Sequence, residues 1–263
     1  MDKASSKAVA VIVAHPDDET LWAGGTILSY PSWNWCIVTL CRASDSDRAP
    51  KFLRALRDLG ATGKMADLDD GPEQKPLDEH EVQGKILELL PTRHFDLVIS
   101  HDPAGEYTRH RRHEEIGRAV ISLWHTGQLS TDELWTFAYE DGGKRYLPRP
   151  IKTASIYHLL PEGTWQRKYE IITRTYGFGQ DSFEADTTPW AESFWQFTSS
   201  TDAQAVISMT GVPGFSFLIF FRSSIPSSPF IEREKFISSN MRSKGASLTY
   251  LIISSAFEAK FGK

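Results

Sequence analysis

Two groups of residues in this sequence combine side chains that bind divalent metal ions. The first, residues 15–19, reads His-Pro-Asp-Asp-Glu and directly follows the apolar run of residues 8–14. An imidazole beside a carboxylate is a zinc-type pair of ligands, and a further carboxylate is what a hydrolytic metal site needs to move protons. A single Asp at such a place is often only a helix cap, but capping explains neither His15 nor the second carboxylate. We therefore expect His15 and Asp18 to turn toward one point in space.

The second group, residues 105–113, contains two histidines spaced three residues apart. His110 and His113 stand at the start of an expected helix, where residues with this spacing can share one face. One of the two can bind the metal while the other stands over the open position. Taken alone, the spacing is weak and more typical of surface histidines. Placed across a crevice from His15 and Asp18, it supplies a third ligand and leaves a position for water, whereas a closed structural zinc site uses four protein ligands.

Alternating strands and helices must position these two groups. We expect strands at residues 8–14, 35–41, 64–68 and 95–100, and helices at residues 19–29, 47–60, 79–90 and 114–124. Such alternation predicts an α/β fold: a Rossmann-like parallel sheet with helices on both faces and right-handed crossovers. The strand order should be near 3-2-1-4-5, with extra C-terminal strands and a helix. In this order the carboxyl ends of the first and fourth strands are neighbours, so the two groups should face each other.

The later part of the chain changes in character. Residues 134–139 and 155–160 are expected strands, and residues 163–176 an expected helix. From residue 203 onward Ser becomes frequent and Trp and His are absent. We therefore expect a catalytic domain over residues 1–202 and an appendage over residues 203–263, in which no motif indicates a function.

Composition limits the classes of function. The formal charge of −5 shows no sign of a nucleic-acid-binding protein. Cys36 and Cys41 are expected on opposite faces of a strand and should not pair, which fits a reducing, cytoplasmic compartment. Residues 1–7 are short and polar, unlike a signal peptide. The apolar run at residues 215–221 is too short to span a membrane, so a soluble protein is expected.

The two motifs together resemble a known family. Ala-His-Pro-Asp-Asp-Glu after the first strand, with His-x-x-His after the fourth, is similar to the zinc-dependent de-N-acetylases of the LmbE-like (PIG-L) family. These enzymes remove acetyl groups from N-acetylglucosaminyl compounds and related amides, so the resemblance implies a small-molecule N-acyl sugar or sugar conjugate as the partner. The resemblance runs from about residue 7 to about residue 197 and includes residues 176–185. It implies a Zn²⁺ cofactor, a general base and an oxyanion-stabilising group: His15, Asp18 and His113 as metal ligands, Asp17 as the base, and His110 at the oxyanion.

The expected substrate contacts follow the family less closely. Arg48 could match an Arg that family members with sugar substrates place after the second strand, but Lys51 stands where they have Glu and cannot accept a hydrogen bond. Glu106 and Tyr107 lie in the loop that bounds the pocket and are expected to touch substrate. His101 is an alternative ligand, a substrate contact or a part of the crevice wall.

The chemistry can be stated without the family. Zinc with three protein ligands lowers the pKa of bound water from about 16 toward roughly 7, which supplies a nucleophile for amide hydrolysis. Asp17 is placed to take the water proton and to deliver it to the leaving amine. A protonated His110 would share the oxyanion charge, and Asp102 or another carbonyl group would orient a ligand histidine.

Two other interpretations remain open. Two histidines and one carboxylate also form the facial triad of Fe(II) oxygenases, although those folds are usually rich in β-structure. A non-catalytic sugar-binding or regulatory module could also keep this fold. Within the hydrolase interpretation the native ion could be Fe²⁺ or Mn²⁺, because oxygen and nitrogen ligands select weakly among these metals.

Overall fold

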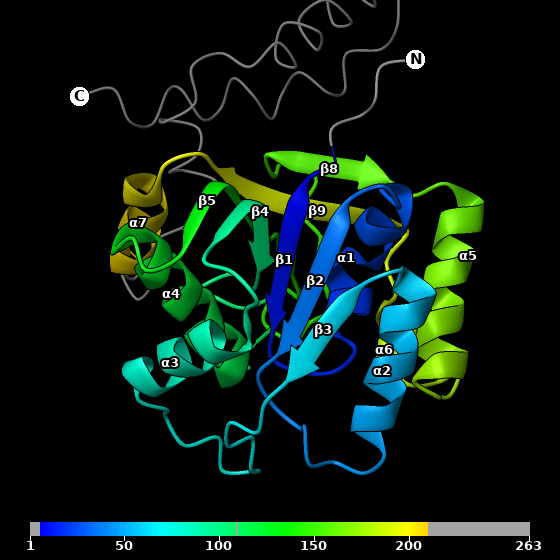
Figure 1. Ribbon diagram of the computed structural model, residues 1–263. Helices are drawn as coiled ribbons and strands as arrows, with labels where there is room; N and C mark the ends of the chain where they lie inside the picture. Colours follow the sequence, from blue (N-terminus) through cyan, green and yellow to red (C-terminus); the bar gives the residue numbers. More distant parts are fainter. Residues whose placement is uncertain (1–5, 109, 210–263) are drawn as a thin grey trace, which may run out of the picture. The chain divides into compact units, whose positions relative to one another are not determined.

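A seven-stranded sheet forms the centre of the molecule, with the strand order β3-β2-β1-β4-β5-β9-β8 (Figure 1). The structure is a computed structural model that describes residues 6–108 and 110–209. The first five strands of the chain are parallel, β9 pairs antiparallel with β5, and β8 pairs antiparallel with β9 at the edge. The strands are β1 (Ala8–Val13), β2 (Asn34–Thr39), β3 (Thr62–Met65), β4 (His94–Ser100), β5 (Ser130–Phe137), β8 (Ile156–Leu159) and β9 (Ala191–Phe197). The predicted order 3-2-1-4-5 and the α/β class are confirmed.

Strand β1 pairs with β2 and β4 along its two edges, and helices cover both faces of the sheet. Every residue from Val9 to Val13 is fully buried. Val9, Val11 and Val13 belong to one core cluster together with Trp22 of the first helix. A continuous apolar, β-branched run is what a strand covered on both faces requires, and the sequence pattern identified it correctly.

Helices cover both faces of the sheet (Figure 1). One face carries α1 (Asp18–Ser29), α2 (Arg48–Leu59), α5 (Glu162–Glu170) with a π-helical turn at Ile171–Thr175, and the short α6 (Phe183–Thr187). The other face carries α3 (Glu79–Leu89), α4 (Arg111–His125) and α7 (Ser200–Met209). A small hairpin of β6 (Tyr139–Glu140) and β7 (Arg149–Pro150) follows β5. As in other open α/β sheets, the carboxyl ends of β1 and β4 are the place where side chains from separate segments can converge.

The structure differs from the sequence prediction mainly after residue 140. The single helix predicted at residues 163–176 is α5 followed by the π-helical turn. Strand β9 was not predicted, because its sequence includes Glu192 and Ser193, which are nonetheless fully buried. Glu192 is buried because Lys168 pairs with it at 2.7 Å. A buried ion pair of this kind removes the polar-outward alternation on which strand prediction depends.

The C-terminal part of the described chain is helical. The domain boundary expected between residues 202 and 203 falls inside α7, whose Ala203 and Val206 are fully buried. The apolar run at residues 215–221 lies outside the described residues. Cys36 and Cys41 are both buried and unpaired. In the described part of the chain, no helix combines the length and apolar character needed to cross a bilayer.

Candidate metal centre

The first part of the site is built by the turn between β1 and α1. Asp18 is the first residue of α1, and its carboxylate turns back to accept a hydrogen bond from the backbone N–H of His15 (2.8 Å). The same oxygen, Oδ2, lies 3.1 Å from His15 Nδ1. The other oxygen, Oδ1, accepts a hydrogen bond from Trp22 Nε1 (3.1 Å), one helical turn further on. The indole thus holds the carboxylate so that Oδ2 points toward the imidazole.

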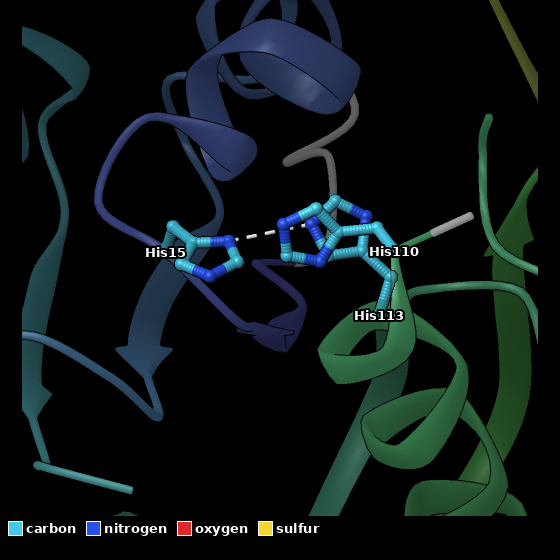
Figure 2. Close-up of side chains that lie close together, drawn as sticks. All are labelled: His15, His110 and His113. Atoms are coloured by element: carbon cyan, nitrogen blue, oxygen red, sulfur yellow. Dashed lines mark hydrogen bonds between the residues drawn. The ribbon is translucent and has the colours of Figure 1, made fainter. Parts of the chain in front are cut away.

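The second part comes from the first turn of α4. His113 Nε2 lies 3.3 Å from Asp18 Oδ2 and 3.3 Å from His15 Nδ1. Figure 2 shows the ring of His15, from the segment after β1, facing the rings of His110 and His113 at the start of α4. The two predicted groups of residues therefore meet at one point, as the parallel order of β1 and β4 requires.

These three atoms fit a divalent metal ion. Donor atoms about 2.0–2.2 Å from a tetrahedral zinc lie roughly 3.3–3.5 Å from each other. His15 Nδ1, Asp18 Oδ2 and His113 Nε2 are separated by 3.1, 3.3 and 3.3 Å. Nitrogen and carboxylate oxygen are donors that zinc, iron and manganese accept. His15, Asp18 and His113 are the residues that would hold such an ion.

Glu106 and His101 contact His113 and do not line the pocket. Both are fully buried. Glu106 Oε2 lies 2.6 Å from His113 Nδ1 and 2.9 Å from His101 Nδ1. The carboxylate thereby orients His113 with Nε2 toward Asp18. His101 Nε2 accepts a hydrogen bond from the backbone N–H of Ala14 (2.9 Å), which leaves this nitrogen engaged.

These positions correct two expectations. Glu106 was expected to touch substrate, but it is fully buried and does not line the pocket. His101 was expected to be an alternative ligand, a substrate contact or a part of the crevice wall. It does not line the pocket either, but its Nε2 lies 3.5 Å from Asp18 Oδ2, so that it stands beside the donor atoms. The orienting role that was expected of Asp102 falls to Glu106 instead. Asp102 accepts hydrogen bonds from Ala104 N (2.8 Å) and Thr136 Oγ1 (3.1 Å), and burial raises the pKa of its carboxyl to about 8.

His110 borders the pocket next to the three donor atoms. Its ring centroid lies 4.2 Å from that of His113 and 4.7 Å from that of His15. Burial and the nearby charges of His113 and His15 lower the pKa of His110 to about 3. The protonated His110 that we expected is therefore disfavoured, and the ring is neutral at pH 7. A neutral ring can still donate one N–H to an oxyanion.

Asp17 occupies a strained backbone position with φ of 125°. Its backbone N–H donates to Glu19 Oε2 (3.0 Å), and its carboxylate lies 3.2 Å from Arg48 Nη1. Burial and the negative charge of Asp18 raise the pKa of Asp17 well above its usual value, although Arg48 opposes this shift. A carboxyl whose pKa moves toward neutrality is suited to accept and return protons.

The electrostatics differ sharply between the two neighbouring aspartates. Burial would raise the pKa of Asp18 too, but the charge of His113 and hydrogen bonds with His101, His113 and His15 hold it well below its usual value. Asp18 is therefore a stable anion facing the imidazoles, whereas Asp17 is the more basic group. The opposite pKa shifts of the two residues suit Asp18 to bind a metal ion and Asp17 to transfer protons.

A cavity of about 200 Å³ opens directly onto these groups. Tyr107 lines it, as expected of a residue in the bounding loop, and its ring packs edge-on against His110 and His113. Arg48 also lines it, with its guanidinium 4.4 Å from the ring centroid of Phe178. The remaining wall is contributed mostly by α1, the loop after β3 and the start of α6: Leu21, Trp22, Arg42, Asp70, Phe183 and Glu184.

Asp70 is the site residue that sequence reasoning missed. Its Oδ1 lies 3.3 Å from His15 Nε2, the ring nitrogen that points away from the other two donors. Residues 69–72 read Asp-Asp-Gly-Pro, which by itself indicates only a turn after the third strand. The sequence position of Asp70 could have identified it, because it follows a parallel strand whose carboxyl end lies on the same sheet edge as His15.

The sheet is mostly parallel and Rossmann-like, and Asp and His donors gather where the ends of β1 and β4 meet. This point is the topological switch point of the sheet. The class of protein is therefore an α/β protein with a candidate metal centre at that point. Residues 10–124 match the family model described as GlcNAc-PI de-N-acetylase, PIG-L. The chain carries a PIG-L (LmbE-like) domain over these residues, as the sequence motifs predicted.

Relatives of known structure share the fold. An N,N'-diacetylchitobiose deacetylase from Pyrococcus horikoshii superposes with a TM-score of 0.59 at 17% identity, covering 81% of this chain and 89% of its own. A deacetylase triple mutant involved in the teicoplanin biosynthetic pathway gives a TM-score of 0.51 at 16% identity, covering 73% and 98%. In sequence, an uncharacterized protein of Acanthamoeba polyphaga mimivirus is 22% identical over 183 residues, which is 64% of this chain and 75% of that protein. The solved structures therefore share the fold of this chain, and the family model matches its residues 10–124.

Proposed function

We propose that this protein is a metal-dependent de-N-acetylase that removes an acetyl group from an N-acetylglucosaminyl-type or related amide. The observation that carries the proposal is the convergence of His15 Nδ1, Asp18 Oδ2 and His113 Nε2 within 3.3 Å of each other, with Asp17 alongside. The PIG-L domain and the deacetylase named among the structural relatives support the choice of an N-acetyl sugar over other amides.

The residues around the donor atoms have separate tasks in amide hydrolysis. When bound, a zinc ion would polarise the carbonyl group and lower the pKa of a coordinated water toward roughly 7. Asp17, with its raised pKa, takes the proton from the attacking water and passes it to the leaving amine. Arg48 orients the Asp17 carboxylate through their 3.2 Å contact. His110 is placed to donate its N–H to the developing oxyanion, a contribution of about 3 kcal/mol for an oxyanion-hole donor.

The size of the cavity limits how the substrate enters. At about 200 Å³ it is smaller than a pocket for a drug-sized ligand, which spans about 300–1,000 Å³. We therefore expect the acetamido group and the adjoining part of one sugar ring to enter the cavity, and the rest of a larger conjugate to remain outside. Tyr107 and Arg48 border the cavity and are the side chains proposed to contact the ring.

The function can be tested by measuring release of acetate and free amine. The substrates are a panel of N-acetylglucosaminides and simple N-acyl amides, incubated with protein that is metal-free, zinc-loaded, iron-loaded or manganese-loaded. We expect turnover of at least one N-acetylglucosaminide that stops on addition of a chelator and returns when metal is restored. Hydrolysis that is unaffected by complete removal of metal would contradict the proposal.

The same donor set matches the facial triad of an Fe(II) oxygenase, so the assay is run without oxygen. Acetate release under anaerobic conditions supports the hydrolase. Oxygen consumption with a 2-oxo acid, without acetate release, would favour the oxygenase. Calorimetric binding of the sugars without any hydrolysis would instead indicate a non-catalytic module.

A further inference from the structure

The two ring nitrogens of His15 face different carboxylates. Nδ1 points to Asp18 and His113, the other two proposed ligands. Nε2 is buried, has no partner in good hydrogen-bond geometry, and lies 3.3 Å from Asp70 Oδ1. A histidine that binds metal through one nitrogen usually donates its other N–H to a carboxylate or carbonyl, which selects the tautomer. Asp70 is the carboxylate that stands at this position.

Asp70 is itself held in place by neighbouring donors. Arg42 donates to its Oδ2 through both Nη2 (2.8 Å) and Nε (3.2 Å). Gln74 Nε2 donates to its Oδ1 (2.8 Å). These contacts fix the orientation of the Asp70 carboxylate, and its side chain is only 9% exposed. The carboxylate is therefore ready to receive an N–H from His15.

The loop that carries Asp70 is fastened to the helix that carries His113. Arg112, the residue before His113, is fully buried and donates hydrogen bonds to the backbone carbonyl groups of Asp69 and Lys75. Arg112 also pairs with Glu115 on its own helix. The β3–α3 loop and the first turn of α4 are thus one connected unit beside His15.

We propose that Asp70 is a positioning residue for His15: it accepts the Nε2–H and so turns the Nδ1 lone pair toward Asp18 and His113. Glu106 makes the corresponding contact with Nδ1 of His113, so each proposed imidazole ligand has its own carboxylate. The inference rests on the proposed metal site. Cys41 also lies near His15 and Asp70. We do not assign a second metal there, because Arg42 and Gln74 already engage the Asp70 carboxylate.

The test compares zinc binding in Asp70→Asn and Asp70→Ala with the wild-type protein. In the Asn variant, Arg42 is expected to keep the amide oxygen, which turns the amide NH₂ toward His15 and favours the wrong tautomer. Zinc affinity is measured by competition with a chelating dye, and metal stoichiometry by elemental analysis. We expect both variants to bind zinc about 10–100-fold more weakly, the usual effect of removing such an outer carboxylate.

Two readouts separate positioning from a structural role. In the zinc-loaded wild type, the Nε2–H proton of His15 should give a downfield NMR signal that moves upfield in Asp70→Asn. The control Asp69→Asn alters the adjacent carboxylate, which is 58% exposed and 3.7 Å from Arg112. Asp69→Asn should bind zinc with the affinity of the wild type. Without metal, Asp69→Asn and Asp70→Asn should unfold at similar urea concentrations.

The outcomes distinguish the two proposals. Zinc affinity in Asp70→Asn within twofold of wild type would overturn the inference while leaving the metal site intact. Two zinc ions per wild-type chain, with one lost in Asp70→Asn, would also overturn it, because Asp70 would then be a ligand. Failure of the wild-type chain to bind zinc, iron or manganese would overturn the proposed function and this inference together.

Discussion

Asp17 and Glu19, in the turn after β1, have different roles although both are acidic. The positive φ of Asp17 costs about 1–3 kcal/mol in a non-glycine residue. Glu19 offsets this by accepting the Asp17 N–H, while its other oxygen accepts hydrogen bonds from Thr20 Oγ1 (2.6 Å) and Tyr176 OH (2.7 Å). The acidic residues of this turn are therefore not interchangeable caps: one holds the backbone, one faces the imidazoles and one faces the pocket.

Replacing Asp17 by Asn should separate catalysis from metal binding. The amide cannot accept and return a proton, so kcat should fall about 10²–10⁴-fold, the range for a lost general base. Metal content should stay unchanged, because Asp17 is not among the three converging donors. Steady-state kinetics and elemental analysis check the two parts.

The matched control is Asp47→Asn, which removes a carboxylate that pairs with Lys51 at the surface. Its kcat should equal that of the wild type. Activity retained in Asp17→Asn would show that another group accepts the proton.

At the scale of elements, α1 is held by residues of two other elements, β9 and β6. Glu192 of β9 accepts the backbone N–H groups of Gly25 and Thr26 (2.7 Å each) and pairs with Lys168 of α5. Tyr139 OH donates to the carbonyl group of Trp22 (3.1 Å). Since α1 begins at Asp18, these contacts fix the helix whose first turn forms the site.

Lys168→Met should destabilise the protein because it leaves Glu192 buried without its counter-charge. Removing one partner of a buried pair typically costs about 3–5 kcal/mol. The hydrogen bonds from Gly25 and Thr26 remain, so we expect the lower end of this range. Urea unfolding of metal-free protein measures the change.

Lys85→Met is the control, because Lys85 pairs with Glu88 on the exposed face of α3. It should change the free energy of unfolding by no more than about 1 kcal/mol. An equal decrease in the free energy of unfolding of both variants would mean that the buried pair contributes no more to stability than the exposed pair.

The loop between β4 and α4 is anchored by Asp141, which accepts hydrogen bonds from Thr108 N (2.7 Å), Thr108 Oγ1 (2.8 Å) and Gly143 N (2.9 Å). Burial alone would raise the pKa of Asp141, but these donors outweigh it and hold the pKa below its ordinary value of 3.8. The folded state thus favours the ionised form. The resulting stability is present above the unfolded pKa and is lost as the pH falls through the lower, folded pKa.

Asp141→Asn should therefore reduce stability at pH 6 to 7 more than in acid. As the pH falls below about 4, the unfolded carboxyl becomes protonated first and the folded one only at its lower pKa, where it resembles the amide. The two unfolding free energies should therefore converge through this acid range. Urea unfolding across this pH range checks it, with Asp132→Asn as a control at an exposed position of β5. A difference that is constant with pH would refute the anchoring role of the charge.

At the scale of the whole molecule, the site joins segments from three regions of the chain, so metal binding should be linked to folding. A ligand at about 100 times its Kd adds about 2.7 kcal/mol to the free energy of unfolding. We expect zinc to raise the unfolding temperature of the wild type and a chelator to reverse the rise.

The rise should be nearly absent in Asp18→Asn, which lacks the anionic donor. Identical unfolding temperatures with zinc and with chelator would show that these segments do not share a metal. Calorimetry at fixed protein concentration is the appropriate measurement.

How far the sequence predicts this protein differs between its parts. The apolar run of β1 and the residues that end it are contiguous, so their composition and order were sufficient to locate the strand and the acidic turn. The β3-β2-β1-β4-β5 order followed from the alternation of strands and helices. Strand β9 did not follow, because the burial of Glu192 depends on Lys168, 24 residues away.

The site shows the same division. By itself, the sequence determined which side chains are available and that two groups of them end neighbouring parallel strands, because strand order and crossover handedness are set by local chemistry. Only the tertiary structure decided that Glu106 lies under His113, that His110 is neutral, and that Asp70 faces His15. Those outcomes depend on which distant groups exclude water from each side chain and which ones hydrogen-bond to it.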